Sequence, residues 1–512
     1  MSGQRTPPTD VLVVGGGLVG LTASLLLRHH GVAVTLVERR ATTSAQPKAR
    51  RLHMRSMEIF RELGLAGLVH DAARELAGHD HMAVGQTLAD AEQLPLWQAS
   101  GPGEPIIQPS PELPCLLSQD LLEPLLRDAA TGVGVDVRFA TELVGFTQSD
   151  DHVDARLLDH RDDRQYDLAA QYLVAADGAH SRSREALGIT RSRNGFVGHP
   201  SVSVYFSADL AEVVRGREFN LCRITHPDAS GTLASVDGRQ RWVFMSPGES
   251  VDRDWPALLR RALGVPATDL AVMSALSWRP EMRVADRYSA ERVHLAGDAA
   301  HVMPPFAASG ANTGIADVHN LAWKLAAALG GQASARLLHS YDAERRPAGW
   351  FAADQSSRRT QQIRDRSTPD PTLAHPYVLA AGGYQYTAGA LMLSPEGPDD
   401  PEPVTRFAPR GRVGTRVPHR WLDPSRTRST IDLAGPGWAL LTTREPPRLT
   451  VPVDHPRFDV HQLDEVGFLG PDELVLLRPD HTVAWRGTSP STALTALRMI
   501  LDADSNPQPS DP

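Results

Sequence analysis

Three glycines near the N-terminus are spaced for binding the phosphates of a nucleotide. Gly15, Gly17 and Gly20 follow an apolar run and precede a leucine-rich segment. In such a G-x-G-x-x-G turn, glycine permits the tight bend and lets a pyrophosphate approach the N-terminus of the following helix. Glu38 ends the next apolar run, 18 residues after Gly20, where an acid binds a ribose diol. The pattern predicts a dinucleotide site, and it leaves NAD and FAD equally open.

Two aspartates follow later runs that have the composition of buried strands. Asp177 comes after residues 172–176, and Asp298 comes after residues 292–296. The carboxyl ends of parallel strands form the crevice in which open α/β sheets bind ligands. Either aspartate alone is best explained as a turn residue. Together they favour ligand contact at the edge of one sheet.

Composition excludes several classes of function. The 512 residues carry a net charge of −9, which argues against binding to nucleic acid or to an acidic membrane surface. Cys115 and Cys222 form neither a disulfide framework nor a metal-ligand spacing, so we expect no metal and a cytoplasmic location. The N-terminus lacks the plan of a signal peptide, and the apolar segment at 11–27 contains too many glycines to favour a membrane span.

The order of the expected elements predicts an α/β fold in three units. Strand and helix patterns at 1–77, 112–190 and 284–380 indicate one discontinuous nucleotide-binding domain, which includes a long helix at 312–329. Residues 78–111 and 191–283 indicate a second, mainly antiparallel domain with one helix at 255–263. Residues 381–412, rich in glycine and proline, have the composition of a linker. Residues 413–505 form a third unit with expected strands at 429–433, 438–442, 473–477 and 483–485.

Over residues 10–350 the motifs together resemble the class A flavoprotein monooxygenases, the family of p-hydroxybenzoate hydroxylase and phenol hydroxylase. The resemblance rests on the glycine turn with Glu38, on Asp177-Gly178, and on Gly297-Asp298 running into Pro304-Pro305 and residues 310–315. Residues 319–324 and 340–347 add to it. The sequence is most similar to the aromatic-polyketide hydroxylases of antibiotic biosynthesis. Residues 413–505 resemble the thioredoxin-like domain of phenol hydroxylase, but they contain no cysteine and are expected to serve as structural support.

The resemblance implies a Rossmann-like FAD-binding domain interleaved with an antiparallel substrate domain. It implies an FAD-dependent monooxygenase that is reduced by NADPH, or less favourably NADH, reacts with O2, and hydroxylates a polycyclic aromatic polyketide through a C4a-hydroperoxyflavin. Baeyer–Villiger oxidation or oxidative rearrangement of the same substrate class is the alternative. A flavin-binding partner protein without monooxygenase activity is a remote one, motivated by Ala307-Ala-Ser309 in place of the family's glycine-rich turn. A monomer or homodimer is expected.

The resemblance also implies roles for individual residues. Glu38 would hold the adenosine ribose, Gln119 and Asp298 the ribityl chain, and Pro305 the edge of the isoalloxazine. Backbone N–H groups at the start of the helix that follows would face the flavin O2 edge. The full set of expected cofactor contacts is Gly15, Gly17, Leu18, Val19, Gly20, Glu38, Arg39, Lys48, Arg50, Gln119, Asp177, Asp298, Pro305, Gly310, Ala311 and Asn312. The candidates for substrate contact are Tyr205, Arg223, His226, Trp242, Phe244 and Pro304. No residue is assigned as a general base.

Overall fold

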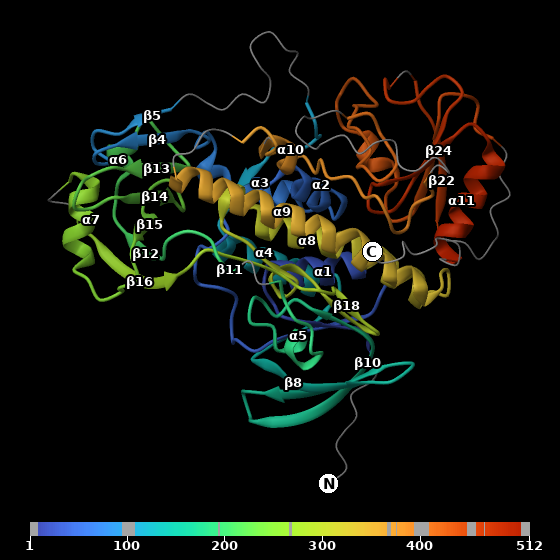
Figure 1. The fold of residues 1–512 in the computed structure, drawn as a ribbon, viewed down its shortest axis with the longest axis horizontal. Coiled ribbons are helices and arrows are strands. Elements are labelled where there is room, and N and C mark those ends of the chain that lie inside the picture. The colour runs from blue at the N-terminus through green and yellow to red at the C-terminus, as the bar shows by residue number, and fades with distance from the viewer. Residues whose placement is uncertain are drawn as a thin grey trace.

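Two long helices run through the middle of the molecule and separate its other parts. The computed structural model describes residues 9–94, 108–192, 195–265, 269–365, 370–374, 376–393, 409–447, 457–464 and 466–502. Helices α8 (Ser309–Leu329) and α9 (His339–Asp365) extend between an antiparallel domain at one end and the C-terminal unit at the other (Figure 1). Among the described residues, no helix combines the length and apolarity that crossing a membrane requires.

A parallel sheet forms the core of the first domain. Its central strands are β7 (Asp136–Phe139), β2 (Val34–Glu38), β1 (Thr9–Val14), β10 (Arg164–Ala175) and β19 (Val293–Leu295), in that order. Adjacent members of this series are parallel, while the short β18 (Ser289–Ala290) pairs antiparallel with β19. Strand β9 (Val153–Asp159) pairs antiparallel with β10, and β8 (Thr141–Gln148) pairs antiparallel with β9, so these two strands extend the sheet from β10. Because parallel strands end at one edge, the fold brings the glycine turn, Glu38 and both predicted aspartates to that edge.

Helices cover this sheet and complete its apolar core. Helix α1 (Leu18–His29) packs against α8 and against α4 (Gln119–Gly132). The strands and α1 supply fully buried side chains such as Val11, Leu21 and Leu36, and α8 adds Ile315. Smaller elements complete the domain: β3 (Arg51–Leu52), α2 (Met54–Glu62), α3 (Ala66–Ala72), η1 (Arg74–Leu76), β6 (Cys115–Leu116), α5 (Arg182–Ala186), η2 (Gly297–Ala299), η3 (Phe306–Ala308), η4 (Ala335–Leu338) and α10 (Pro376–Ala380). The Rossmann-like fold class predicted from the sequence is confirmed.

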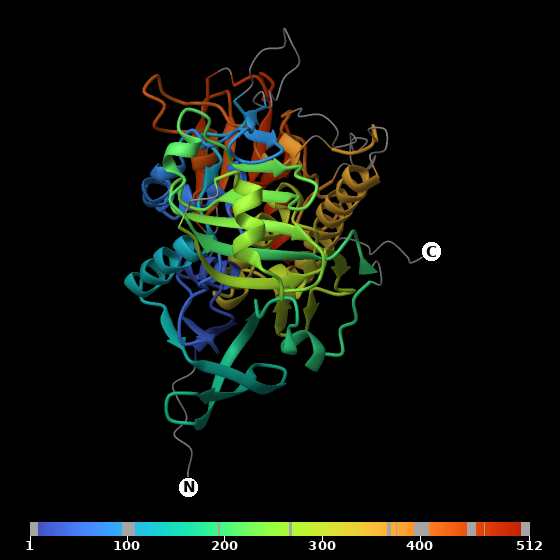
Figure 2. The same ribbon diagram turned by 90° about the vertical axis from the view of Figure 1, so that its left-hand side faces the viewer.

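The second domain is a seven-stranded sheet, antiparallel except for one pair. Its order is β16 (Ala271–Trp278), β12 (Ser201–Ser207), β15 (Arg241–Pro247), β14 (Gly231–Ser235), β13 (Leu221–Ile224), β4 (Met82–Gly85) and β5 (Glu92–Gln93), and only β13 and β4 run parallel. Helix α7 (Trp255–Leu263), which spans the predicted helix, lies across its outer face (Figure 2). A short α6 (Ala211–Val214) joins this domain. The strands β11 (Gly195–Phe196), β17 (Glu281–Val284) and β20 (His301–Val302) connect it back to the first domain.

The C-terminal unit is a four-stranded sheet that shares a core with α8. The order is β22 (Phe458–Gln462), β21 (Trp438–Thr442), β23 (Leu474–Leu477) and β24 (Val483–Gly487), and α11 (Pro490–Asp502) packs on it. Trp323 of α8 stacks edge-on against Trp438 at 5.6 Å between ring centroids. The apolar contact supports the expectation of a structural role.

Two predictions for this region need correction. Residues 429–433 were expected to form a strand, but η5 (Thr430–Leu433) is a 3₁₀ helix. Ser429 and Asp432 form a capping box that satisfies the backbone N–H groups a strand would leave for a neighbour. Residues 381–393 of the predicted linker are packed between the domains, with Ala390 in the apolar cluster that surrounds Trp438. Residues 394–408 lie outside the described residues.

His294 in β19 makes stability depend on pH. Its side chain is 1% exposed, Nδ1 is 2.9 Å from Ser289 Oγ, and Nε2 has no hydrogen-bond partner among the described residues. Burial lowers the pKa of His294 to about 3, against about 6.5 for an unfolded histidine. Below pH 6.5 the unfolded chain binds a proton that the folded chain refuses, so stability falls as the pH drops towards 3.

We therefore expect His294→Phe to reduce acid sensitivity. The loss of unfolding free energy between pH 7 and pH 5 should be smaller by about 2 kcal/mol than in the wild type. Urea unfolding at the two pH values measures this difference. The same change at His180, which is exposed, serves as the control and should leave the difference unaltered. An equal pH dependence in His294→Phe and the wild type would show that the buried ring does not titrate in this window.

Candidate active site

The glycine turn leaves no room for larger residues. Gly15 has φ +109°, and a Cβ placed there would lie 2.3 Å from the carbonyl oxygen of Ala176. A Cβ on Gly20 would lie 1.8 Å from the carbonyl oxygen of Gly15. Gly17 is the N-cap of α1 and provides no side-chain cap; the N–H of Leu18, the first residue of the helix, donates to Glu123 Oε1, and the N–H groups of the rest of the first turn face the glycine turn. These features fit the phosphates of a dinucleotide.

Glu38 is held rigidly at the end of β2. Its Oε2 accepts the N–H of Gly16 at 2.8 Å, and its Oε1 accepts the N–H of Arg40 at 2.9 Å. A carboxylate has about four acceptor positions, so capacity remains for ribose hydroxyls. The neighbouring Arg39 is exposed. The geometry agrees with a ribose-binding role for Glu38.

A buried carboxylate, Glu123 of α4, also belongs to this region and was missed by the sequence reasoning. Its Oε1 accepts the N–H of Leu18 at 3.1 Å and its Oε2 accepts the N–H of Ser44 at 2.8 Å. Gln119 Nε2 donates to the same carboxylate at 2.6 Å. Glu123 therefore ties the 44–49 loop to the start of α1. The i,i+4 spacing of Gln119 and Glu123 at the start of this helix was the available signal.

The two candidate cations, one in this loop and one directly after it, have different environments. Arg50 donates to the carbonyl oxygen of Ser235 and, at 3.1 Å, to Asn220 Oδ1, so it fastens the second domain to the first. Burial lowers the pKa of Arg50 to about 10. Lys48 is exposed and lies close enough to Asp298 to favour ionisation of that carboxyl. Lys48 is therefore the better placed of the two for a cofactor phosphate or ribityl group.

Asp298 lies beyond the end of β19, where protein atoms surround its carboxyl group but the side chain still reaches solvent. The surrounding protein raises the pKa of Asp298 by desolvation, although His301 and Lys48 act in the opposite direction. The side chain itself is exposed to solvent. A carboxylate in such a position has free acceptor capacity for hydroxyl donors. Asp177 differs, because its carboxylate accepts from Ser181 Oγ at 2.6 Å and from the N–H of Ser183 at 3.0 Å, and so caps α5.

The start of α8 faces the same edge of the sheet. Its N-cap, Ala308, has φ +54°, a left-handed conformation at the position where the family has a glycine-rich turn, and provides no side-chain cap. The first N–H groups of a helix have no intrahelical partner and favour negative charge. Gly310 and Ala311 lie in this first turn. Pro305 is exposed just before it, whereas Pro304 is buried.

The Asn312 side chain is fully occupied by structural bonds. Its Oδ1 accepts the N–H of His53 at 2.7 Å and the hydroxyl of Ser56 at 2.6 Å. Its Nδ2 donates to the carbonyl oxygens of Arg51 at 3.0 Å and Ala308 at 2.7 Å. Asn312 could contact a cofactor only through its backbone, as the sequence reasoning expected. Its side chain instead fixes α2 against the start of α8.

One face of the second sheet meets the first domain, and Tyr205 lies on it. Arg241 of β15 donates to Asp120 Oδ2 at 2.9 Å, next to Gln119, and reaches the Tyr205 hydroxyl at 3.5 Å. Gln46 Nε2 also donates to Ser274 Oγ at 3.1 Å across the same boundary. Tyr205 packs with Ala234, Val236 and Val243 in a cluster separate from the main core of the domain. This Tyr205 face of the second sheet therefore borders the first domain beside Gln119.

Trp242 and Phe244 are corrected as substrate contacts. Successive residues of a strand point to opposite faces, so both side chains lie on the other side of β15 from Val243. They are buried in the core beneath α7, and Trp242 Nε1 donates to the carbonyl oxygen of Ala208 at 3.0 Å. The alternation was visible in the sequence, but which face meets the first domain was not. Arg223 is exposed on β13, and His226 Nδ1 accepts the N–H of Asp228 at 3.1 Å.

Comparison with known proteins identifies the family. A family model described as an FAD binding domain matches residues 8–356, and one described as the C-terminal part of an aromatic-ring hydroxylase matches 410–503. The chain belongs to the FAD-dependent aromatic-ring hydroxylases. The tetracenomycin A2 monooxygenase-dioxygenase of Streptomyces glaucescens is 37% identical to it, over 98% of this chain and 97% of that protein.

Solved structures of related enzymes agree with this assignment. Aklavinone-11 hydroxylase, in a ternary complex with FAD and aklavinone, matches with a TM-score of 0.79 and 29% identity over 97% of this chain and 100% of that one. The rebeccamycin biosynthetic enzyme RebC with reduced flavin matches with a TM-score of 0.81 and 29% identity over 97% and 99%. The hydroxylase is therefore a flavin-dependent monooxygenase, and FAD is its cofactor. The glycine turn, Glu38 and the uncapped start of α8 fit that cofactor.

In this hydroxylase, Asp298→Ala is expected to lose bound flavin while the protein stays folded. An exposed carboxylate at the strand edge can bind ribityl hydroxyls, and its charge is not needed to neutralise a buried cation. We expect the FAD dissociation constant to rise at least about tenfold, the loss of one charge-assisted hydrogen bond. The yellow absorbance retained after gel filtration measures this, with circular dichroism as the test of folding. Undiminished flavin content would disprove the placement of the ribityl chain at Asp298.

A group of acid and imidazole side chains links the hydroxylase's α2 and α8 to its C-terminal unit. Glu62 Oε2 is 2.7 Å from His319 Nε2 and 3.1 Å from His481 Nε2, a spacing that a metal ion could use. Arg55 reaches Nδ1 of both rings, at 3.2 Å and 2.8 Å. Since Arg55 can only donate, the ring proton is assigned to Nε2 in each case. A protonated Nε2 donates to Glu62 and cannot ligate a metal, so this group joins the domains by hydrogen bonds.

Proposed function

We propose that the protein hydroxylates a polycyclic aromatic polyketide, using NADPH or NADH and O2. The observation that carries the proposal is the Tyr205 face of the second sheet, which meets the cofactor domain beside Gln119. A planar aromatic substrate placed between this face and the flavin edge would contact both domains. The tetracenomycin and aklavinone enzymes, whose names specify polycyclic aromatic compounds, support this substrate class.

The residues of the chain would contribute binding, orientation and exclusion of water. Bound FAD supplies the redox chemistry that activates oxygen. The apolar cluster of Tyr205, Val243 and their neighbours would shield the reacting ring from water. Arg241, held by Asp120 and by Asp237 Oδ2 at 3.0 Å, would keep the Tyr205 hydroxyl at a fixed position on the substrate-facing side.

Product analysis tests this proposal. The purified protein is incubated with FAD, NADPH, O2 and a panel of polycyclic phenols, and the products are identified by mass spectrometry and NMR. We expect the gain of one oxygen as a ring hydroxyl, together with NADPH oxidation that depends on the phenol. Failure of every polycyclic phenol to stimulate NADPH oxidation would refute the proposal.

The same experiment separates the alternatives. Oxygen inserted into a carbon–carbon bond next to a carbonyl would indicate Baeyer–Villiger or rearrangement chemistry, because the pocket, and not the cofactor motifs, decides where oxygen is delivered. FAD binding without any NADPH oxidation would favour the flavin-binding partner protein, which the altered turn Ala307-Ala-Ser309, with Ala308 in a left-handed conformation, motivates. A monomer or a homodimer would be compatible with each outcome.

A further inference from the structure

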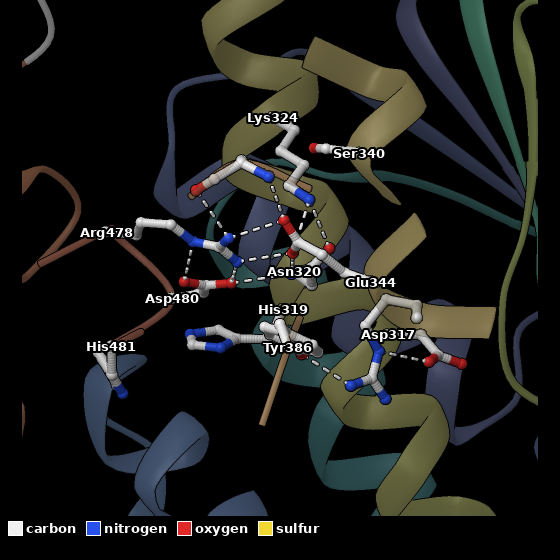
Figure 3. Close-up of polar contacts among 12 residues, drawn as sticks. Asp317, His319, Asn320, Lys324, Ser340, Glu344, Tyr386, Arg478, Asp480 and His481 are labelled. Atoms are coloured by element: carbon white, nitrogen blue, oxygen red, sulfur yellow. Dashed lines mark hydrogen bonds and ion pairs between the residues drawn. The ribbon is translucent and has the colours of Figure 1, made fainter. Parts of the chain in front are cut away.

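Two of the sequence motifs to which no cofactor role was assigned meet the C-terminal unit in one buried network. The motifs are residues 319–324 of α8 and residues 340–347 of α9, and the C-terminal unit contributes residues 478–480. Figure 3 shows their polar side chains pointing toward one another between the helices and the C-terminal strands. A network of charges without solvent is costly unless every member is placed by its partners. The residues that belong to the network therefore show which elements of the molecule are held in fixed positions relative to one another.

The C-terminal end of the network is Arg478. Its Nη1 and Nη2 donate to the two carboxylate oxygens of Glu344, at 2.8 and 2.9 Å. Its Nε donates to Asp480 Oδ1 at 2.9 Å. Lys324 Nζ donates to Glu344 Oε2 at 2.9 Å. These four side chains are essentially unexposed, so two cations and two anions are balanced without water.

The residue after Glu344 continues the network toward the cofactor domain. Arg345 Nε donates to Asp317 Oδ1 at 2.9 Å, and Nη1 donates to the Tyr386 hydroxyl at 2.8 Å. The Tyr386 ring also contacts two guanidinium groups, with Arg345 at 5.9 Å and Arg478 at 5.6 Å from its centroid. Arg345 Nη2 donates to the carbonyl oxygen of Thr313, in the early turns of α8, at 3.3 Å.

The far end of the network is the backbone of Gly297, in the segment that carries Asp298. Asp317 Oδ2 accepts the N–H of Gly297 at 3.1 Å and Nε2–H of His301 at 2.7 Å. Gly297 has φ +60° and directly precedes Asp298. Burial alone would raise the pKa of Asp317, but His301 and Arg345 hold it below its usual range. Asp317 is thus an ionised carboxylate that holds Gly297, and with it the segment that carries Asp298.

We propose that Asp317 and Arg345 are positioning residues for the flavin half of FAD, and that the C-terminal unit is part of this support through Tyr386 and Arg478. The contacts join the C-terminal unit to Gly297, next to Asp298, and to Thr313, near the start of α8. Gly297 packs against Val19, but none of the hydrogen bonds described above involves the glycine turn or Glu38, the residues expected to hold the adenosine half. The C-terminal unit thus acts on flavin binding without thiol chemistry.

The test compares FAD with ADP, which carries only the adenosine half. In Asp317→Asn, an amide replaces one of two acceptor oxygens, so the side chain cannot accept from Arg345 and from the Gly297–His301 pair at once. Titration of the apoprotein, followed by flavin fluorescence and by ADP competition, should show FAD binding weakened at least tenfold and ADP binding changed less than twofold. Asp159→Asn is the matched control, because Asp159 is buried and paired with Arg161 but lies in the β9 hairpin.

A milder variant keeps the proposal testable should Asp317→Asn fold poorly. Tyr386→Phe removes only the hydroxyl that Arg345 contacts and leaves the ring between the guanidinium groups. It should weaken FAD binding severalfold, again without affecting ADP, and its effect should not add to that of Asp317→Asn. Equal loss of FAD and ADP binding, or a lowered melting temperature with FAD affinity within twofold of the wild type, would overturn the proposal.

These measurements need neither substrate nor NADPH. They therefore test the support of the flavin site separately from the proposed hydroxylation. A protein that binds FAD as expected but oxidises no polycyclic phenol would refute the substrate class and leave this inference standing.

Discussion

Gly20→Ala is expected to abolish FAD binding by the full-length protein. The added Cβ would lie 1.8 Å from the carbonyl oxygen of Gly15, and this backbone atom cannot rotate away as a side chain could. Helix α1 would have to move off β1, which would displace the N–H groups that face the pyrophosphate. We expect the FAD dissociation constant to rise at least about 100-fold, roughly 2.7 kcal/mol, and overpacking to cost about 1–3 kcal/mol of stability. Isothermal titration with FAD and urea unfolding measure the two effects.

Gly67→Ala is the matched control for this prediction. Gly67 lies in α3, and a Cβ there would meet nothing within 4 Å. Alanine in a helix is more favourable than glycine, so this variant should be about 0.5–1 kcal/mol more stable and should bind FAD normally. FAD binding by Gly20→Ala at wild-type affinity would show that the turn can open without loss of the cofactor site.

Among the variants proposed for this protein, Glu344→Ala is expected to cause the largest loss of unfolding free energy. The carboxylate is unexposed and accepts from Arg478, from Lys324 and from the N–H of Ala390 at 2.7 Å. Removing it leaves two buried cations with too little negative charge, which costs about 3–5 kcal/mol. The C-terminal unit should then loosen from α8 and α9. Urea unfolding gives the energy, and limited proteolysis should show faster cleavage in the C-terminal part.

A surface carboxylate on the same helix provides the comparison. Asp354 pairs with Arg358 at 3.4 Å in an exposed i,i+4 arrangement. Exposed pairs contribute about 0–1 kcal/mol, so Asp354→Ala should be nearly neutral and should leave the proteolysis pattern unchanged. Similar losses in both variants would mean that the buried network does not carry the domain contact.

Local patterns were enough to predict the glycine turn, the strand that ends at Glu38 and the helix at 312–329. The turn at Gly15 and Gly20 follows from steric limits of a few consecutive residues, and Glu38 follows at a fixed distance along one βα unit. The antiparallel strands of the second domain could also be predicted, because the alternation of apolar and polar residues and the turn residues between strands are features of short stretches of sequence. Residues 429–433 were misjudged since a capping box, formed by Ser429 and Asp432, outweighed the strand composition between them.

The side of the second sheet that meets the first domain could not be predicted in the same way. Alternation along β15 separates Trp242 from Val243, but it does not show which side meets the first domain. Contacts between distant segments decide this, such as Arg241 with Asp120 and Arg50 with Asn220. Two of the six proposed substrate contacts, Trp242 and Phe244, were therefore placed on the wrong face.

By itself, the sequence determined the dinucleotide anchor at Gly15 to Glu38, the parallel-sheet fold and the family. Each of these depends on residue types at short, fixed spacings, which a sequence displays directly. Only the tertiary structure decided that Arg50 pairs with the second domain while Lys48 lies near Asp298, which face of the second sheet meets the first domain, and how Asp317, Arg345 and Arg478 join the C-terminal unit to Gly297. In the buried network, the contact between Glu344 and Arg478 joins residues 134 positions apart, and such charges are paired only because the folded core excludes water.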